Sequence, residues 1–175
     1  ITACEGIDED LSGFMCSCGG KFSMRELTFG CHNRNGHGIQ NMKEAMTNSC
    51  NPYFIELSKK LDVESFRDTA FSLGFGREIQ LFAGGIASTG VLPTVKELSV
   101  PAELANFSFG QGKLSATPLH ISQLTCAIAN NGKMPVLRVI KGLTSDGKTV
   151  GNEKKPQLVY AMEEETAEML RTLMA

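Results

Sequence analysis

The stretch NMKEAMTNSCNPYFIEL, residues 41–57, joins two helical patterns through a short polar break. Apolar Met42 and Met46 recur at helical spacing before the break. After it, Pro52 suits the first turn of a new helix, because the N–H that proline lacks would be unpaired there anyway. We therefore expect Asn51 to be the N-cap of the second helix. The tripeptide Ser49-Cys50-Asn51 would then lie at the junction of the two helices.

Local signals elsewhere predict further helices and one hairpin. Asp62 is a typical N-cap, and Gly74 is a typical C-terminal stop for the helix that follows it. Thr117-Pro118 predicts a helix start, with Ile121, Leu124 and Ile128 as its apolar side. Residues 136–143 are typical of a strand, and the turn at 145–148 predicts a returning strand. Glutamates 163–165 suit the positive end of a final helix.

These patterns divide one domain into three parts. Residues 1–38 are rich in Cys, Gly, Ser and Asn and are predicted to be irregular, with ELTFGC (26–31) as a candidate for one short strand. Residues 39–134 are predicted to be helical and contain the Ser-x-Asn loop. Residues 135–175 are predicted to form a β-hairpin and a C-terminal helix. A chain of 175 residues with 42% hydrophobic residues is long enough to bury a core as one domain.

Charge and hydropathy exclude some partners. The 17 basic and 19 acidic residues give a formal net charge of −2, so no basic face is implied and nucleic acid is not expected as a partner. No apolar run is long enough to cross a bilayer. We therefore expect this chain itself to make no membrane contact.

The N-terminal part contains a set of candidate zinc ligands. Cys16, Cys18, Cys31 and His37 have the side chains that hold zinc in small structural sites. However, the Cys-x-Cys spacing is tighter than the usual gap of two to four residues. Zinc is therefore the alternative interpretation, and we expect neither a metal nor a cofactor.

The competing interpretation of the cysteines is a disulfide between Cys4 and Cys31. Disulfides persist in exported proteins, so we favour this pairing if the protein is exported. Cys50 and Cys126 fall within helical patterns and are expected to be small core residues.

Several stretches, taken in order, resemble the transpeptidase domain of class B penicillin-binding proteins. The similarity spans about residues 30–135, and the order and spacing of the stretches are more specific than any one of them. They are GHG leading into an N-x-x-x-A helix (36–45), SCNPYFIEL (49–57), LGFG (73–76), GVLP (90–93), SFGQGKLSATPL (108–119) and AIANNGKM (127–134).

This resemblance implies an α/β parent fold, shared with serine β-lactamases, in which a sheet is flanked by helices. The present chain would be the predominantly α part, the helical subdomain with a short β-hairpin near 136–152. The implied activity is that of a D,D-transpeptidase that cross-links peptidoglycan and is acylated by β-lactams. Among the subfamilies, the cysteine-bearing approach to Ser-x-Asn is most similar to the elongation or sporulation type of Gram-positive bacteria.

The resemblance also implies partners and a location. Peptidoglycan stem peptides and β-lactams would bind the parent protein, and other proteins of cell-wall synthesis would be its partners. The parent would work on the extracytoplasmic face of a bacterial cell membrane. It would be anchored by an N-terminal segment that is not in this chain.

Ser49 and Asn51 match the second of the three family motifs, Ser-x-Asn, and are implied as catalytic residues. Acyl transfer must move a proton from a serine nucleophile to the departing amine, and the Ser49 hydroxyl would relay it. The Asn51 carboxamide can donate to a substrate carbonyl and accept from a lysine at once. The intervening Cys50 would point away. A purely structural role, with Ser49 ending one helix and Asn51 capping the next, is compatible with this interpretation.

The other two family motifs are not found in this chain. The sole Ser-x-x-Lys is Ser145-Asp146-Gly147-Lys148, which lies in a turn downstream of Ser-x-Asn, whereas the family places its nucleophile upstream. Lys148-Thr149-Val150 has Val where the family's Lys-Thr-Gly has Gly. We therefore expect a chain that begins after the nucleophile helix and ends before the Lys-Thr-Gly strand. Such a chain would be inactive by itself.

Three alternatives remain open at this point. A penicillin-sensing receptor domain would share the fold and motifs but signal instead of cross-linking. A non-enzymatic extracellular module would use residues 4–37 as a zinc or disulfide loop. The third alternative is a helical protein with no site.

Overall fold

The computed structural model describes residues 1–5, 13–82, 85–140, 142–150 and 157–175. In these residues helices occupy more of the chain than strands do, as the sequence predicts. The helices are α1 (Met42–Thr47), α2 (Asn51–Ser58), α3 (Val63–Ser72), α4 (Val95–Leu98), α5 (Pro101–Ser108), α6 (Pro118–Ala129) and α7 (Glu164–Met174).

The strands pair two by two into small antiparallel sheets. The pairs are β1 with β4, β2 with β3, β5 with β6, β7 with β10 and β8 with β9. Their bounds are β1 (Cys16–Cys18), β2 (Lys21–Met24), β3 (Leu27–Gly30), β4 (Gly38–Gln40), β5 (Ile79–Phe82), β6 (Gly85–Ala87), β7 (Lys133–Pro135), β8 (Leu143–Ser145), β9 (Lys148–Val150) and β10 (Leu158–Tyr160).

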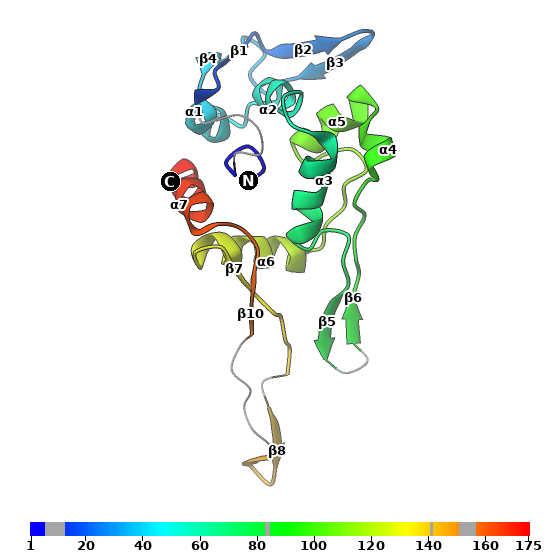
Figure 1. Ribbon diagram of the computed structural model, residues 1–175, viewed down its shortest axis with the longest axis vertical. Helices are drawn as coiled ribbons and strands as arrows, with labels where there is room; N and C mark the ends of the chain where they lie inside the picture. Colours follow the sequence, from blue (N-terminus) through cyan, green and yellow to red (C-terminus); the bar gives the residue numbers. More distant parts are fainter. Residues whose placement is uncertain (6–12, 83–84, 141, 151–156) are drawn as a thin grey trace.

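Figure 1 shows how these elements are arranged. Strands β1 to β4 lie beside α1 and α2, with α3, α4 and α5 on one side. Helices α6 and α7 lie together farther along the molecule, and the N-terminal residues lie between them and α2. The β5–β6 and β8–β9 hairpins project away from the helices. The junction of α1 and α2 is thus held between a layer of short strands and a helical body.

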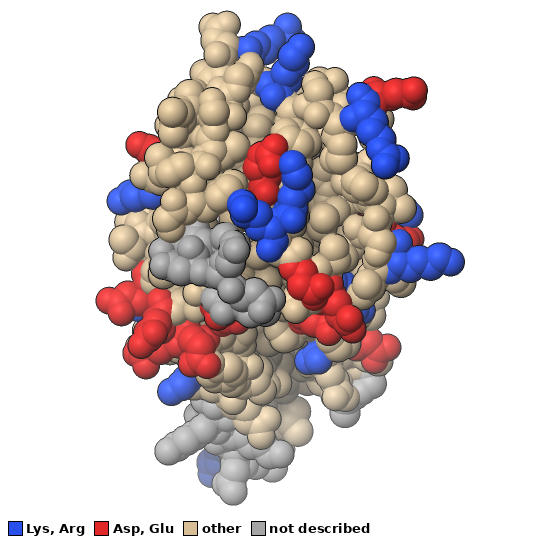
Figure 2. Space-filling view, turned by 45° about the horizontal axis from the view of Figure 1, so that its top comes forward, with Lys and Arg blue, Asp and Glu red and all other residues tan. Residues whose placement is uncertain are grey.

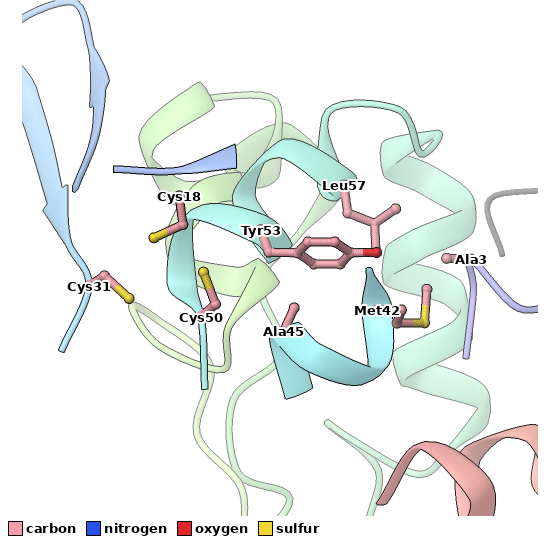
Figure 3. Close-up of a cluster of buried hydrophobic side chains, with 8 residues drawn as sticks. All are labelled: Ala3, Cys18, Cys31, Met42, Ala45, Cys50, Tyr53 and Leu57. Carbon is pink, nitrogen blue, oxygen red and sulfur yellow. The ribbon is translucent and has the colours of Figure 1, made fainter. Parts of the chain in front are cut away.

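Two clusters of buried side chains form the core. The first surrounds Tyr53 and Leu57 of α2 and includes three cysteines, Cys18, Cys31 and Cys50 (Figure 3). The second joins α6 and α7 to the end of α3; its buried members are Leu73, Phe75, Ala127, Met134, Met162, Ala167 and Leu170. Side chains of both clusters line a largely apolar cavity of about 300 Å³.

The predicted helix ends are confirmed where a capping residue marks them. The Asp62 carboxylate accepts a hydrogen bond from the Ser65 backbone N–H at 2.8 Å and so caps α3. Gly74 follows α3 with φ +99°, the left-handed conformation that glycine adopts without steric cost. Thr117 caps α6, with the His120 side chain as its partner in a capping box.

The predicted apolar side of α6 is confirmed for Leu124 and Ile128, which pack against the second cluster, but not for Ile121. Ile121 is 50% exposed, whereas His120, Gln123 and Ala127 are buried. The polar residues are tolerated because they have partners: the Gln123 side chain donates to the Pro135 carbonyl, and the His120 ring contacts the Arg77 carbonyl. Cys126, predicted to be a core residue, is exposed, so that prediction is wrong.

The strands also differ from the predictions. The part predicted to be irregular contains β1 and β2 as well as β3, which lies within the candidate strand at 26–31. The strand predicted at 136–143 is wrong, because the chain is extended and paired at 133–135 and at 143–145 instead. The turn at Asp146-Gly147 is confirmed as the link between β8 and β9. The end of the predicted hairpin, residues 151–152, lies outside the described residues.

The surface carries charges of both signs. On the face shown in Figure 2, basic and acidic side chains are interspersed among larger uncharged areas. None of the helices in the described residues combines the length and hydropathy that a membrane span requires.

Candidate functional site

The candidate site begins where α1 ends. The Ser49 N–H donates to the Met46 carbonyl at 3.1 Å, and the Cys50 N–H donates to the Ala45 carbonyl at 2.9 Å. These two bonds form a Schellman motif, in which the residue after the C-cap adopts a left-handed conformation. That residue is Ser49, with φ +46°. The motif exposes the Ser49 hydroxyl and directs the chain into α2.

The start of α1 is fixed as firmly as its end. The Asn41 side chain accepts from the Glu44 N–H at 2.9 Å, and the Glu44 carboxylate accepts from the Asn41 N–H at 2.9 Å, which completes a capping box. Beyond the helix, the Asn48 side chain donates to the Gln40 side chain at 2.7 Å. These bonds fix both ends of the short helix that precedes Ser49.

Asn51 is positioned differently from the prediction. The N-cap of α2 is Cys50, whose side chain makes no capping hydrogen bond, and Asn51 is the first residue of the helix. The expected capping role is therefore wrong. The Asn51 side chain donates to the carbonyl of Gly30, at the end of β3, at 3.0 Å. The strand, and not the helix, orients this carboxamide.

Asn51 lies at the edge of an open depression of about 690 Å³. Basic side chains of Lys21 and Arg34 line it together with the glycines at 19, 20 and 30. The arrangement places a partly exposed carboxamide beside positive charge. Such groups can bind peptide carbonyls and carboxylates.

Cys50, between Ser49 and Asn51, is fully buried. Its side chain packs in the first core cluster, beside Cys18 and Cys31 (Figure 3). Burial raises the pKa of the Cys50 thiol to about 12. Burial also opposes ionisation of Cys18, yet hydrogen bonds from the Gly20 and His37 backbone and from the thiols of Cys50 and Cys31 lower the pKa of Cys18 below its ordinary value.

The structure brings together four metal-ligating side chains, but they are not the predicted four. Cys18, Cys31, His37 and Cys50 lie side by side, with all their candidate ligand atoms within 4.8 Å of one another. Cys16 is not in this group; its thiol contacts the carbonyl of Ser17. Sequence reasoning missed Cys50 because it lies 13 residues beyond His37, in a helical pattern. Only the fold places it beside β1.

The predicted disulfide between Cys4 and Cys31 stays a prediction. All six cysteines have free thiols in the structure. Cys31 lies in the four-residue group, and Cys4 packs at the edge of the first core cluster.

Comparison with known proteins gives a consistent result. The family model for the penicillin binding protein transpeptidase domain matches residues 17–175. Stage V sporulation protein D of Bacillus subtilis is 32% identical over 143 residues, which are 81% of this chain and 22% of that protein. Peptidoglycan D,D-transpeptidase MrdA of Acinetobacter baumannii is 30% identical over 115 residues, which are 62% of this chain and 17% of that protein.

The fold is likewise similar to solved structures. The D,D-transpeptidase domain of a peptidoglycan glycosyltransferase from Eggerthella lenta superposes with a TM-score of 0.84 at 20% identity. The match covers 98% of this chain and 45% of that one. At this identity the likeness shows the fold alone, and it confirms the predicted fold class. The chain spans about a fifth of the length of the curated relatives named above.

Proposed function

This chain belongs to the penicillin-binding protein transpeptidase domain family, and we propose that its parent protein is a serine D,D-transpeptidase that cross-links peptidoglycan. The observation that carries the proposal is the geometry of Ser49 and Asn51. Backbone hydrogen bonds hold Ser49 just beyond the end of α1. A hydrogen bond from the Asn51 side chain to the Gly30 carbonyl, at the end of β3, orients Asn51. Both lie at the helix junction where the family's second motif is expected.

The chemistry is acyl transfer. A serine outside this chain attacks the carbonyl of the terminal D-alanyl-D-alanine bond, the bond to the leaving D-alanine breaks, and the serine ester is then attacked by an amine of a second stem peptide. The exposed Ser49 hydroxyl passes the nucleophile's proton towards the leaving amine. The Asn51 carboxamide binds the peptide backbone and orients it, so that attack occurs from a fixed geometry.

We propose the finer features of this function from the family and from the sequence. The chain by itself is inactive, because its sole Ser-x-x-Lys lies in the β8–β9 turn, where the serine and lysine flank a two-residue bend. The parent acts on the extracytoplasmic side of a bacterial membrane with other cell-wall synthesis proteins. The relatives named above do not favour a receptor or a non-enzymatic module.

The test is the rate at which labelled penicillin acylates the parent protein. We expect Asn51→Ala to lower this rate by about 100-fold or more, as for the loss of one preorganised polar group in an active site. Asn35→Ala removes a carboxamide from an exposed turn before β4 and should leave the rate unchanged. The 175-residue chain should form no covalent adduct at all.

Two results would contradict the proposal. An unchanged rate in Asn51→Ala would remove this residue from the site. A stoichiometric adduct with the 175-residue chain would show that the nucleophile lies within it.

A further inference from the structure

The open depression beside Asn51 has two positively charged side chains in its wall. Lys21 on β2 and Arg34 in the turn after β3 both line it, and its lining in the described part of the chain contains no aspartate or glutamate. Neither side chain belongs to any of the three ion pairs found among the described residues. The depression therefore presents two cations without a carboxylate partner in the described part of the chain.

The backbone places Lys21 beside the Asn51 carboxamide. Lys21 pairs with Gly30 across the β2–β3 hairpin, which lies beside α2 (Figure 1). The Gly30 carbonyl is the group that accepts the 3.0 Å hydrogen bond from the Asn51 side chain. Paired residues of antiparallel strands have Cα atoms about 4.5–5.5 Å apart. The Lys21 side chain therefore starts one strand spacing from the residue that orients Asn51, and Gly30 has no side chain to separate the two.

The turn that carries Arg34 is closed against Gly20. A Cβ at Gly20, where φ is +86°, would lie 2.1 Å from the Arg34 carbonyl oxygen. Two bonds of the Asn33 side chain fix the turn from within: it donates to the Gly36 carbonyl at 2.7 Å and accepts from the Asn35 N–H at 3.1 Å. The backbone of Arg34 is thus held against the residue directly before β2.

The floor of the depression is bare between the two cations. Gly20 cannot carry a side chain for lack of space, and Gly19 and Gly30 line the depression with it. At the edge, Asn51 retains binding capacity. A carboxamide has two N–H donors and an accepting oxygen, and one donor is bonded to Gly30. A ligand held by Asn51 can therefore extend over the glycines towards both positive charges.

We propose that Lys21 and Arg34 bind a free carboxylate of the donor stem peptide whose backbone Asn51 holds, so that the parent protein selects acidic stem peptides over amidated ones. This inference rests on the proposed function, and it adds a determinant of specificity. A guanidinium binds a carboxylate through two parallel N–H donors, and an ammonium adds a compact charge. Stem peptides offer such a carboxylate on D-glutamate and, in the diaminopimelate type, also on the residue before D-alanyl-D-alanine.

The exposure of the two cations sets the size of the expected effect. Hydrogen bonds between charged groups contribute a factor of about ten or more to binding when they are well formed. Lys21 and Arg34 are both exposed, so solvent and salt weaken their attraction for a ligand. We therefore expect about tenfold selection from the pair together at low salt, and much less at about 1 M salt, where the Debye length is about 3 Å.

Release of D-alanine from stem pentapeptides by the parent protein tests this selection. Three donors are compared: one with all carboxylates free, one amidated on D-glutamate and one amidated on diaminopimelate. We expect kcat/KM to be about tenfold lower for one of the two amidated donors, and that donor identifies the carboxylate that is bound. High salt should remove most of the difference.

Charge-removing variants assign the selection to the depression. The double variant Lys21→Gln with Arg34→Gln should bring the ratio of kcat/KM for the free and amidated donors close to one. The control, Arg25→Gln with Lys96→Gln, removes the same two charges at exposed positions, in the turn at the other end of the β2–β3 hairpin and on α4. It should keep the wild-type ratio. Because each ratio is measured on one preparation, a partial loss of folded protein does not affect it.

Two results would overturn the inference while leaving the proposed function intact. One is a wild-type parent that penicillin acylates but that uses all three donors with equal kcat/KM. The other is a Lys21→Gln, Arg34→Gln variant that keeps the wild-type ratio.

Failure of the proposed function would look different, because the parent would neither be acylated by penicillin nor release D-alanine from any donor. Binding of the same three peptides to the 175-residue chain, followed by the backbone amide NMR signals of Gly20 and Lys21, needs no nucleophile. Shifts that require the free carboxylate and both cations would support the carboxylate site. Equal shifts with all three peptides, or none, would contradict it.

Discussion

At position 49 the backbone conformation favours glycine, whereas the proposed proton relay needs a serine hydroxyl. At the end of α3 the equivalent left-handed position is occupied by Gly74, whereas α1 has Ser49 there with φ +46°. A residue with a Cβ in this conformation costs about 1 kcal/mol relative to glycine. The hydroxyl is exposed. The serine is thus a poorer end for α1 than a glycine would be.

We therefore expect Ser49→Gly to stabilise the 175-residue chain by about 0.5–1 kcal/mol, because glycine adopts the left-handed conformation without strain. The free energy of unfolding in urea measures this. Thr47→Gly, at an exposed helical position two residues earlier, should instead destabilise by about 0.3–0.5 kcal/mol, the difference between the helix propensities of threonine and glycine. A Ser49→Gly chain that is less stable than the wild type would show that the side chain contributes bonds that outweigh the strain.

The residues of the candidate site were predictable to different degrees. Ser49-Cys50-Asn51 could be placed at a helix junction because the helical spacing before it and Pro52 after it are local signals. The contact between Asn51 and Gly30 joins residues 21 positions apart and could not be found that way. The same holds for Cys50, whose neighbours in the metal-ligating group come from three other segments.

At the scale of elements, α4 shows how a four-residue helix is stabilised. Thr94 and Glu97 form a capping box, and the Glu97 carboxylate also accepts from the Lys113 ammonium at 3.0 Å. Hydrogen bonds from the Thr94 backbone, together with those from Lys113 and the Thr94 hydroxyl, lower the pKa of Glu97 to about 2. Lys113 lies in the glycine-rich turn before α6, so the Glu97 carboxylate links α4 to that turn.

The pH dependence of stability should show this interaction. Because the pKa of Glu97 is lower in the folded chain, its stabilising effect is complete above about pH 4.5, the pKa of an unperturbed glutamate. It is lost as the pH falls towards about 2. Glu97→Gln should therefore flatten the dependence of the urea midpoint on pH between about pH 5 and 3. Glu168→Gln, on α7, is the charge-matched control, and an equal flattening there would contradict the assignment.

Helices whose ends are marked by capping residues were predictable from sequence. Strands that form only by pairing with a distant strand were not. Asp62, Gly74 and Thr117 each act through residues at most four positions away, so their effects are visible in sequence. Strand β1 is three residues long, and its sequence of Cys-Ser-Cys has no apolar alternation. It exists because β4, whose residues lie 20 to 24 positions further along the chain, pairs with it, and single-sequence patterns do not register such a partner.

At the scale of the whole molecule, two core clusters share an apolar cavity of about 300 Å³. The first cluster holds one of the two tyrosines in the chain, and the chain has no tryptophan. Tyr53 is fully buried and its hydroxyl donates to the Phe14 carbonyl at 3.0 Å. Burial raises the pKa of Tyr53 to about 12, and a hydrogen bond with Glu163 raises that of Tyr160.

Tyrosine ionisation should accordingly report global unfolding. At about pH 10.5 an unperturbed tyrosine is largely ionised. The folded chain should show little tyrosinate absorbance there, and denaturant should raise it sharply. Because protonated Tyr53 is favoured in the folded state, its contribution to stability is complete below about pH 10 and is lost as the pH rises through about 12. Tyr160→Phe isolates the Tyr53 signal; tyrosinate in that folded variant at pH 10.5 would contradict the assigned burial.

The order of short sequence motifs predicted the fold class, but it did not predict how the helices pack against their neighbours. The stretches between residues 36 and 134 predict a helical body, which the structure confirms. Which face of α6 is buried depends on the carbonyls of Pro135 and Arg77, which accept from Gln123 and pair with His120. These partners come from β7 and from the connection after α3. Their positions follow from tertiary structure alone.

The left-handed serine at the end of α1 also has a consequence for directed evolution of this protein. A library screened only for expression or heat resistance would enrich glycine at position 49, because selection for folding alone rewards the relief of strain. A consensus drawn from such survivors would be a more durable protein that had lost its candidate proton relay. Selection for penicillin acylation should retain serine, so the two screens should diverge at this codon.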